Sequence, residues 1–140
     1  MAIVTSEEAK LLVDLAVEAR RRAYAPYSNY LVGAALRTSS GRIFTGVNVE
    51  NAAYPSTICA ERSAIVSAVS QGEREFDVIA VSTSNGGYPC GGCRQAMAEF
   101  GLDTIILIAD ADGNLLEENK LNKILPGAFT PSSLLGTNKP

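Results

Sequence analysis

The 140-residue sequence predicts an α/β fold, a three-layer α/β/α sandwich around a mixed sheet of mostly five strands. Helical and strand-like segments alternate along most of the chain. Residues 104–109 are almost wholly apolar, as expected for a strand that is covered on both faces. The strand, helix and strand predicted over residues 76–109 imply a right-handed crossover, and therefore at least one parallel pair of strands.

The chain is predicted to begin with an amphipathic helix and a β-hairpin. Thr5 and Glu8 form a capping-box pattern, apolar side chains follow at helical spacing, and Pro26 ends the segment. Two strand-like runs, residues 31–37 and 42–49, flank a Ser-Ser-Gly turn and predict the hairpin.

The later elements alternate between helices and strands. Residues 57–70 predict a helix with apolar side chains around much of its circumference, which indicates burial, and Gly72 closes it. The elements expected next are a strand at 76–83, a helix at 91–100, strands at 104–109 and 115–118, and a short helix at 121–125. We expect a single domain over residues 1–140, with a flexible tail at about 131–140 because that stretch is rich in Ser, Gly, Asn and Pro.

The composition argues against several classes of function. Twelve Lys and Arg against 15 Asp and Glu give a formal net charge of −3, which disfavours broad electrostatic binding to nucleic acid or anionic membrane. The sequence contains no apolar run long enough to span a bilayer and no signal-peptide pattern. We therefore expect a cytoplasmic protein, in which clustered cysteines are more often metal ligands or catalytic thiols than disulfides.

All three cysteines lie in two short motifs at predicted helix starts. Cys59 stands in Cys-Ala-Glu, and Cys90 and Cys93 stand in Pro-Cys-Gly-Gly-Cys, three residues apart and so on one face of a helix. Helix N-termini favour thiolates, and thiolates are zinc ligands. An odd number of cysteines also excludes complete disulfide pairing within one chain.

Three thiolates predict a catalytic zinc site with one Zn²⁺ per chain. A structural zinc site normally has four protein ligands, whereas a catalytic site has three and a water molecule. The chain has no histidine and no fourth cysteine. The site is therefore open, shared between chains, or completed by a carboxylate, and an open site is the simplest of these. Ligation by three cysteines favours zinc over other thiophilic metals.

Two charged residues beside Cys59 fit such a site. Glu61 is placed to take a proton from zinc-bound water and return it to a leaving group. Zn²⁺ with three thiolates sums to −1, and a hydrogen bond from Arg62 to a thiolate would offset that charge. Arg94, next to Cys93, is a second candidate for this role. Each feature alone has an ordinary structural explanation, and their combination favours catalysis.

The chain resembles the cytidine deaminases of the cytidine and deoxycytidylate deaminase superfamily, whose signature is ligand-x-Glu followed by P-C-x-x-C. The segments that carry the resemblance are PYSNYLVGAAL (26–36), GVNVENAAYPSTICAER (46–62), PCGGCRQ (89–95) and LPGAF (125–129). The resemblance implies hydrolytic deamination of cytidine and 2′-deoxycytidine to the uridines, with release of ammonia, in pyrimidine salvage. Zinc hydroxide would attack C4, and Glu61 would shuttle protons to N3 and the departing amine.

The resemblance also implies a substrate site and an assembly. Asn48 and Glu50 would hold the ribose hydroxyls, and Ala60 would belong to the same substrate-binding set. Tyr30 stands where the family has a phenylalanine that packs by the pyrimidine, and Phe129 resembles an aromatic residue that reaches into a neighbouring subunit's site. Family members of this size with three cysteine ligands are typically homotetramers, so we expect a homotetramer with sites completed across subunit interfaces.

Two other hypotheses compete with cytidine deamination. A deaminase of the same chemistry would act on a nucleoside antibiotic such as blasticidin S, or on cytosine in nucleic acid. The acidic balance and the Asn48–Glu50 motif disfavour the nucleic-acid version. A zinc-binding module without activity would have no need of Glu61. Tyr30 and the 84–88 loop, which is slightly shorter than in the family, bear on which modified cytidines fit.

Overall fold

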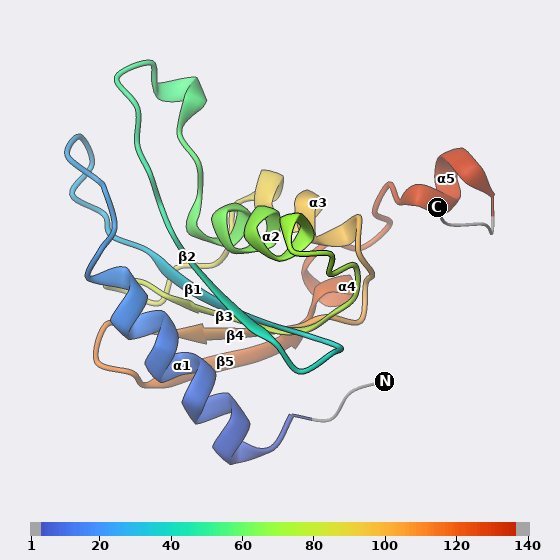
Figure 1. Ribbon diagram of the computed structural model, residues 1–140, viewed down its shortest axis with the longest axis horizontal. Coiled ribbons are helices and arrows are strands. Elements are labelled where there is room, and N and C mark those ends of the chain that lie inside the picture. The colour runs from blue at the N-terminus through green and yellow to red at the C-terminus, as the bar shows by residue number, and fades with distance from the viewer. Residues whose placement is uncertain (1–3, 137–140) are drawn as a thin grey trace.

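A five-stranded mixed sheet lies between two helical layers in the computed structural model, which describes residues 4–136 (Figure 1). The strand order is β2-β1-β3-β4-β5. The pair β3–β4 is parallel, and the other neighbouring pairs are antiparallel. The predicted sandwich and the predicted parallel pair are confirmed.

The helices and strands follow the predicted order. The strands are β1 (Gly33–Thr38), β2 (Ile43–Val47), β3 (Phe76–Ser82), β4 (Ile105–Ala109) and β5 (Leu115–Lys120). The helices are α1 (Ser6–Arg20), α2 (Ala60–Ser70), α3 (Gly91–Ala98), α4 (Leu121–Ile124) and α5 (Pro131–Leu135), with a 3₁₀ turn at Tyr54–Ser56. The predicted capping box of Thr5 and Glu8 opens α1.

The two faces of the sheet pack against different helices, because successive residues of a strand point to opposite sides. On one face, Ala35, Val78, Ala80, Leu107 and Ala109 pack against α1. On the other face, Ala34, Leu36, Ile79, Val81, Ile106 and Ile108 pack against α2, α3 and α4. The second layer is the one that carries the cysteine motifs.

Helix α2 approaches β2 very closely at Gly46. A Cβ atom there would lie 2.4 Å from the backbone nitrogen of Ala64 and 2.5 Å from the carbonyl oxygen of Ala60. Only glycine permits this approach, which fixes how deeply the start of α2 sits on the sheet. The helix was predicted to be buried around much of its circumference. Only the face of α2 that packs on the sheet is buried, since Val66 is 59% exposed.

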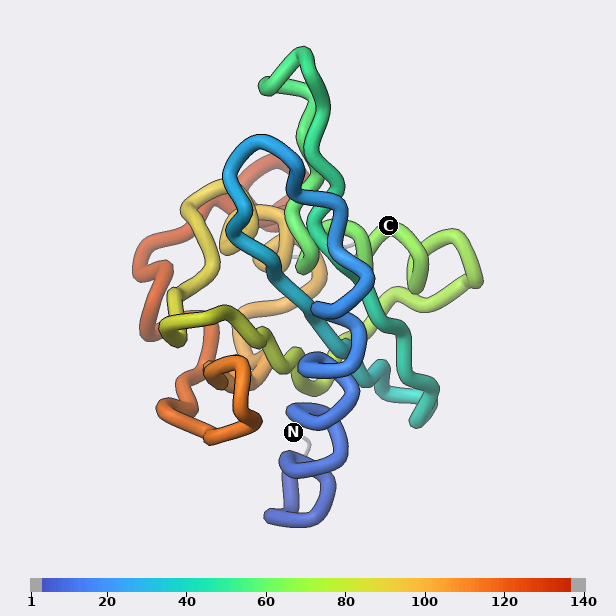
Figure 2. The backbone as a smooth tube through the Cα atoms, turned by 90° about the vertical axis from the view of Figure 1, so that its left-hand side faces the viewer, coloured from blue at the N-terminus to red at the C-terminus, as the bar shows by residue number. Residues whose placement is uncertain are grey.

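The segment between β2 and α2 projects from the body of the molecule in both views (Figures 1 and 2). Val49 and Ile58 form an antiparallel bridge at its base. This bridge keeps residues 57–59 extended, so that α2 begins at Ala60 rather than at the predicted Thr57.

The C-terminal region contains α5 within the stretch that was predicted to be a flexible tail. Residues 137–140 lie outside the described residues, so the tail and the single-domain boundary stay predictions. Among residues 4–136, no helix is both long enough and apolar enough to cross a membrane.

Candidate active site

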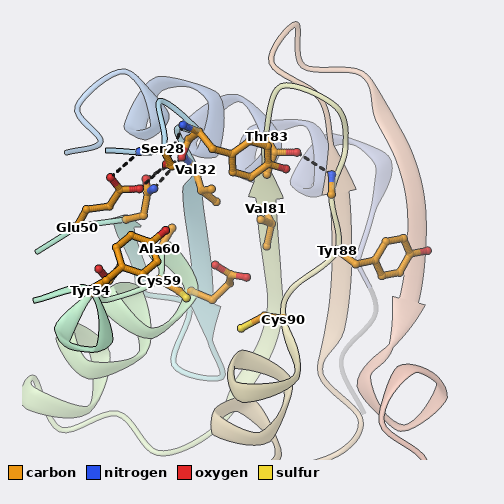
Figure 3. A pocket seen from close by; sticks show the side chains of 15 residues that line it. Ser28, Val32, Glu50, Tyr54, Cys59, Ala60, Val81, Thr83, Tyr88 and Cys90 are labelled. Atoms are coloured by element: carbon orange, nitrogen blue, oxygen red, sulfur yellow. Dashed lines mark hydrogen bonds between the residues drawn. The ribbon is translucent and has the colours of Figure 1, made fainter. Parts of the chain in front are cut away.

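A cavity of about 250 Å³ opens where the starts of α2 and α3 meet the end of β3 (Figure 3). Its walls come from segments that are far apart in the sequence. They include Tyr30 before β1, Asn48 and Glu50 after β2, and Thr83 after β3. The volume lies slightly below the usual range of ligand pockets, which suits one small molecule.

The sulfur atoms of the three cysteines gather beside this cavity. The Sγ atoms of Cys59, Cys90 and Cys93 all lie within 4.8 Å of one another, and those of Cys90 and Cys93 are 3.5 Å apart. Tetrahedral zinc with Zn–S bonds of about 2.3 Å sets its sulfur ligands about 3.8 Å apart. The cluster therefore fits one zinc ion.

The helix starts present these sulfurs. Cys59 and Cys90 are the N-cap residues of α2 and α3, one position before the first turns in which they were predicted. Neither side chain forms a capping hydrogen bond with the backbone of its own helix, so each sulfur is free to face the cluster. Cys93 lies in the first turn of α3 and is buried. The dipoles of both helices favour negative charge at this point.

The surroundings of the cluster hold negative charge on sulfur. The pKa of Cys59 is lowered to about 5, first by a hydrogen bond from the Cys93 thiol and then by Arg62. Nη2 of Arg62 lies 3.4 Å from Cys59 Sγ, which is the predicted contact. The pKa of Cys93 is raised because its thiol donates to Cys59 and is buried. Adjacent thiols do not all lose their protons without a compensating cation, and a divalent metal supplies that charge.

Glu61 is the buried carboxyl group of the site, with an exposed fraction of 4%. Burial raises its pKa to about 7, and the negative charge on Cys59 acts in the same direction, while its backbone amide and Arg62 oppose the rise. A carboxyl group with a pKa near neutrality both accepts and releases protons at physiological pH. This property fits the predicted proton shuttle.

Arg94 does not contact the thiolates, contrary to the sequence-based expectation. Its Nε donates to the carbonyl oxygen of Pro89 at 2.8 Å, and its Nη1 donates to that of Ile124 at 2.7 Å. The guanidinium also lies 5.7 Å from the centre of the Tyr88 ring. Arg94 thus fastens the loop before α3 to the C-terminal end of α4.

Asn48 and Glu50 both line the cavity, and both bind the segment that precedes β1. The Asn48 amide donates to the carbonyl oxygen of Tyr30 at 2.8 Å and accepts from the Val32 amide at 2.9 Å. The Glu50 carboxylate accepts hydrogen bonds from the backbone amides of residues 27 and 28 and from the hydroxyl of Ser28. The Ser28 hydroxyl is the largest cause that lowers the pKa of Glu50. Binding of ribose by Asn48 and Glu50 stays a prediction.

The remaining predicted residues divide into two groups. Tyr30 and Ala60 line the cavity, and their binding of substrate stays a prediction. Phe129 is 58% exposed and lies outside the cavity wall of its own chain. Its carbonyl oxygen accepts a hydrogen bond of 2.7 Å from Gln95 Nε2, so helix α3 holds this segment in place.

Several wall residues were not singled out as site residues from the sequence. Ser28, Tyr54 and Thr83 line the cavity beside the predicted residues. Only their positions in the sequence could have indicated these residues, since Ser28 lies within the PYSNYLVGAAL segment and Thr83 ends the predicted strand. Hydroxyl groups at such positions are too common to identify a site without the fold.

Three clustered thiols beside a buried carboxyl group are characteristic of a zinc-dependent hydrolase. Residues 6–109 match the family described as the cytidine and deoxycytidylate deaminase zinc-binding region, and the chain belongs to this family.

Proteins from distant organisms are similar over nearly the whole chain. A probable cytidine deaminase of Dictyostelium discoideum is 42% identical over 94% of this chain and 90% of its own length. A cytidine deaminase of Halalkalibacterium halodurans is 42% identical over 89% of this chain and 96% of its own. The crystal structure of cytidine deaminase from Burkholderia pseudomallei superposes with a TM-score of 0.81 at 42% identity, covering 89% of this chain and 99% of that one.

Proposed function

We propose that this protein is a zinc-dependent cytidine deaminase that hydrolyses cytidine and 2′-deoxycytidine to uridine and 2′-deoxyuridine and releases ammonia. The observation that carries the proposal is the cluster of Cys59, Cys90 and Cys93 next to the buried Glu61. The similarity to cytidine deaminases over nearly the whole chain supports the same substrate.

The roles of the residues follow from their chemistry. Cys59, Cys90 and Cys93 hold one zinc ion per chain, and the metal, when bound, lowers the pKa of a water molecule. Glu61 takes a proton from the attacking water and delivers it to ring nitrogen N3 while the water oxygen adds to C4. A second proton then passes through Glu61 to the amino group, and the C4–N bond breaks to release ammonia. Arg62 offsets the negative charge of the thiolates.

The charges around the cavity favour a nucleoside over a nucleotide. Among the described residues that line it, none is Lys or Arg, whereas Glu50 and Glu61 are acidic. A 5′-phosphate would find no cation there with which to pair. We therefore expect deoxycytidylate to be a much poorer substrate than deoxycytidine.

We also propose a homotetramer in which each Phe129 completes the site of a neighbouring subunit. The exposure of Phe129 and its absence from the wall of its own cavity support this arrangement. The projecting segment carries exposed apolar side chains at Val49, Tyr54 and Ile58, which suit a contact with a second copy. We further propose a cytoplasmic enzyme of pyrimidine salvage, because thiols that hold zinc must stay reduced and the cytosol keeps thiols reduced.

Absorbance of cytidine in the ultraviolet tests the proposal when it is followed with the wild-type protein and with Glu61→Gln, alongside metal analysis. We expect conversion to uridine by the wild type, about one zinc per chain in both proteins, and a loss of turnover of about 10²-fold to 10⁴-fold in the variant. A wild-type protein that contains zinc but does not convert cytidine would contradict the assignment as a cytidine deaminase. Conversion of blasticidin S in place of cytidine would favour the antibiotic deaminase instead.

A further inference from the structure

The hydroxyl group of Tyr30 joins two walls of the cavity. Its Oη donates a hydrogen bond of 2.7 Å to Oδ1 of Asn85, in the loop between β3 and α3. The same loop is closed by Thr83, whose Oγ1 accepts from the Gly87 amide at 2.7 Å and donates to Asn85 Oδ1 at 3.3 Å. We call this set of residues, Tyr30, Thr83, Asn85 and Gly87, the latch.

The backbone of Tyr30 is held as firmly as its hydroxyl group. Its carbonyl oxygen accepts from the Asn48 amide at 2.8 Å, and its own amide donates to Ser28 Oγ at 3.0 Å. Because both ends of the residue are fixed, the ring stays in the cavity wall. The hydrogen bond from the Tyr30 hydroxyl therefore fixes the loop that contains Asn85 relative to the wall that contains Tyr30.

Gly87 is required by the Tyr30 hydroxyl and not by its own backbone. Its φ is outside the left-handed region, so an alanine is conformationally allowed there. A Cβ atom, however, would lie 2.5 Å from Tyr30 Oη, while the next nearest atoms, on Asn85 and Thr83, are 3.5 and 3.8 Å away. The one obstacle to a side chain at position 87 is thus the oxygen by which Tyr30 differs from phenylalanine.

The place of Thr83 in the cavity wall indicates which edge of a bound cytosine the latch would face. In cytosine, C4 is flanked by N3 on one side and by C5 on the other. Figure 3 shows Cys59 and Ala60 on one side of the cavity and Thr83 and Tyr88 on the other. Glu61 follows Ala60 in the first turn of α2. A cytosine ring that turned N3 toward Glu61 would turn C5 toward the opposite side of the cavity, where Thr83 of the latch lies (Figure 3).

We propose that the latch limits the size of the substituent at C5 of the pyrimidine, and so selects cytidine over 5-substituted cytidines. This proposal rests on the proposed deaminase activity. The hydrogen bonds of the latch hold Gly87 and the neighbouring wall close to C5. Without the Tyr30 hydroxyl, the wall gains both the space of one oxygen atom and freedom to move.

The test compares kcat/KM for 5-bromocytidine with kcat/KM for cytidine in the zinc-loaded enzyme. We expect the ratio of the two to rise about threefold to tenfold in Tyr30→Phe and in Asn85→Ala, as for loss of one hydrogen bond. The double variant should show no more than the larger single effect, because both changes open the same latch. Tyr24→Phe is the matched control, since Tyr24 is also an exposed tyrosine but lies outside the cavity wall.

A second pair of variants tests the role of Gly87. We expect Gly87→Ala to lower kcat/KM for cytidine at least tenfold, and Tyr30→Phe in the same chain to recover most of that loss. An unchanged ratio in Tyr30→Phe, additive effects of the two single changes, or no recovery of Gly87→Ala would each overturn the latch. Absence of any cytidine turnover by the wild type would instead refute the proposed function.

Discussion

Glu50 is a buried residue with more acceptor capacity than its protein partners use. An ionised carboxylate has about four lone-pair sites. Two backbone amides and the Ser28 hydroxyl occupy three of them. One site therefore remains for a substrate hydroxyl, on a side chain that is already oriented. Such preorganisation lowers the entropic cost of binding.

Replacement of Glu50 by Gln tests this role. A glutamine side chain offers one acceptor oxygen in place of two and carries no charge. The hydrogen bond to ribose is therefore weakened, and so are the hydrogen bonds from the backbone amides of residues 27 and 28. We expect KM for cytidine to rise about tenfold to 100-fold, as for loss of a hydrogen bond to a charged group. The measurement is steady-state kinetics with cytidine and with 2′,3′-dideoxycytidine, which lacks the 2′ and 3′ hydroxyls of the ribose.

The dideoxy substrate separates binding from structure. If Glu50 binds the ribose, Glu50→Gln raises KM much less for 2′,3′-dideoxycytidine than for cytidine. An equal cost with both substrates would mean that Glu50 only supports the wall. Ser28→Ala, which removes one structural contact of Glu50 and leaves its charge, is the matched control and should affect both substrates alike.

At the residue scale, the sequence predicted the metal ligands more completely than the rest of the wall. Cys59, Cys90 and Cys93 could be found because thiols are rare and their spacing fixes them at helix starts. The partners of Arg94 could not be found, because a long side chain next to a ligand has several neighbours within reach. Only the folded chain decides that it bonds to carbonyl oxygens and not to sulfur.

At the scale of elements, the contact between β2 and α2 controls the position of the site. Gly46→Ala would place a methyl group against the backbone of residues 60 and 64, which has no room to move aside. We expect a loss of stability of about 1–3 kcal/mol, as for overpacking, and weaker zinc binding because Cys59 shifts with the start of α2. Chemical unfolding of the metal-loaded protein and zinc competition with a chelator measure the two effects. Gly91→Ala, where a Cβ atom meets nothing within 4 Å, is the control.

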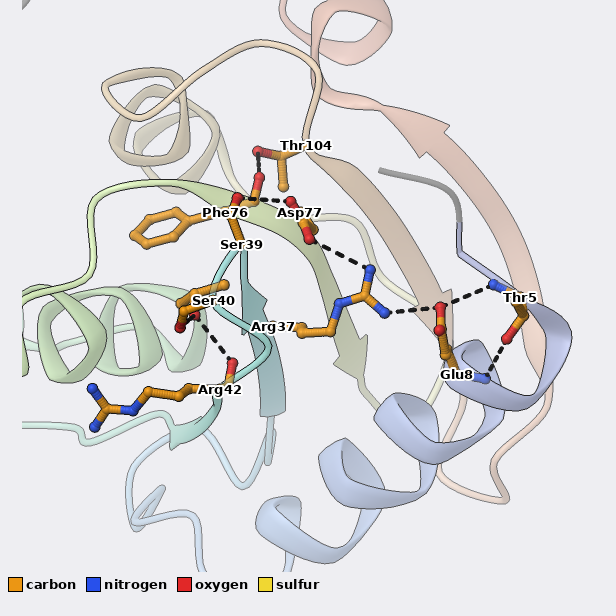
Figure 4. Close-up of polar contacts among 10 residues, drawn as sticks. Thr5, Glu8, Arg37, Ser39, Ser40, Arg42, Phe76, Asp77 and Thr104 are labelled. Atoms are coloured by element: carbon orange, nitrogen blue, oxygen red, sulfur yellow. Dashed lines mark hydrogen bonds and ion pairs between the residues drawn. The ribbon is translucent and has the colours of Figure 1, made fainter. Parts of the chain in front are cut away.

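A second contact between elements fastens α1 to the sheet (Figure 4). Arg37 of β1 donates to the Glu8 carboxylate at 2.8 Å and lies 3.6 Å from that of Asp77 on β3. The hydrogen bond from Arg37 is the main cause that lowers the pKa of Glu8, followed by the amide of Thr5. The capping box of α1 and the C-terminal end of β1 thus share one carboxylate.

The lowered pKa of Glu8 predicts a pH dependence of stability. Since the folded state binds fewer protons at Glu8 than the unfolded state, this stabilisation is present above the ordinary glutamate pKa of 4.5 and is lost as pH falls through the lower, folded value. We expect Arg37→Met to be less stable than the wild type at neutral pH and to lose less stability on acidification. Urea midpoints between about pH 7 and pH 3 measure both effects.

Lys10→Met is the control for the pH series, because the Lys10–Asp14 ion pair is exposed and such pairs contribute little. Protonation of the cysteine thiolates affects all three proteins alike and cancels in the comparison. Parallel acid dependence of Arg37→Met and the wild type would contradict the role of Arg37.

Element types could be predicted from the sequence better than element ends. The start of α2 was placed too early because residues 57–59 adjoin the apolar helical run that follows, although β-branched Thr57 and Ile58 favour extended structure and Ile58 pairs with Val49. Their extended form depends on Val49, nine residues away along the chain from Ile58 and adjacent to it only in the fold. A local pattern holds no information on such a pairing.

At the scale of the whole molecule, the layers and the parallel pair could be predicted, but the order of strands could not. Alternating burial shows which face a residue takes, and the buried run at β4 requires helices on both sides. Neither pattern says that β1 lies between β2 and β3. The order matters for function, because it brings Tyr30, which precedes β1, beside Thr83, which follows β3.

The proposed tetramer makes a prediction that only a whole assembly can fulfil. If Phe129 acts in a neighbouring subunit's site, two defective chains should restore each other's activity. Glu61→Ala removes the proton shuttle from its own cavity but keeps Phe129. Phe129→Ala keeps its own cavity and lacks the side chain it lends to a neighbour. In a mixed tetramer, the cavity of a Phe129→Ala chain still contains its own Glu61. If a neighbouring Glu61→Ala chain supplies Phe129 to that cavity, the site is complete.

We therefore expect the two purified variants, unfolded together and refolded with zinc, to recover a clear fraction of wild-type kcat/KM that neither variant shows alone. Random mixing at equal concentrations lets half of the chains keep Glu61, and about half of those receive an intact Phe129, so the recovery should approach one quarter. The same variants refolded separately and then combined without exchange are the control. Activity of the mixture no greater than the average of the separate proteins would mean that Phe129 serves its own chain or none, whereas recovery near one quarter can arise only from sites shared between subunits.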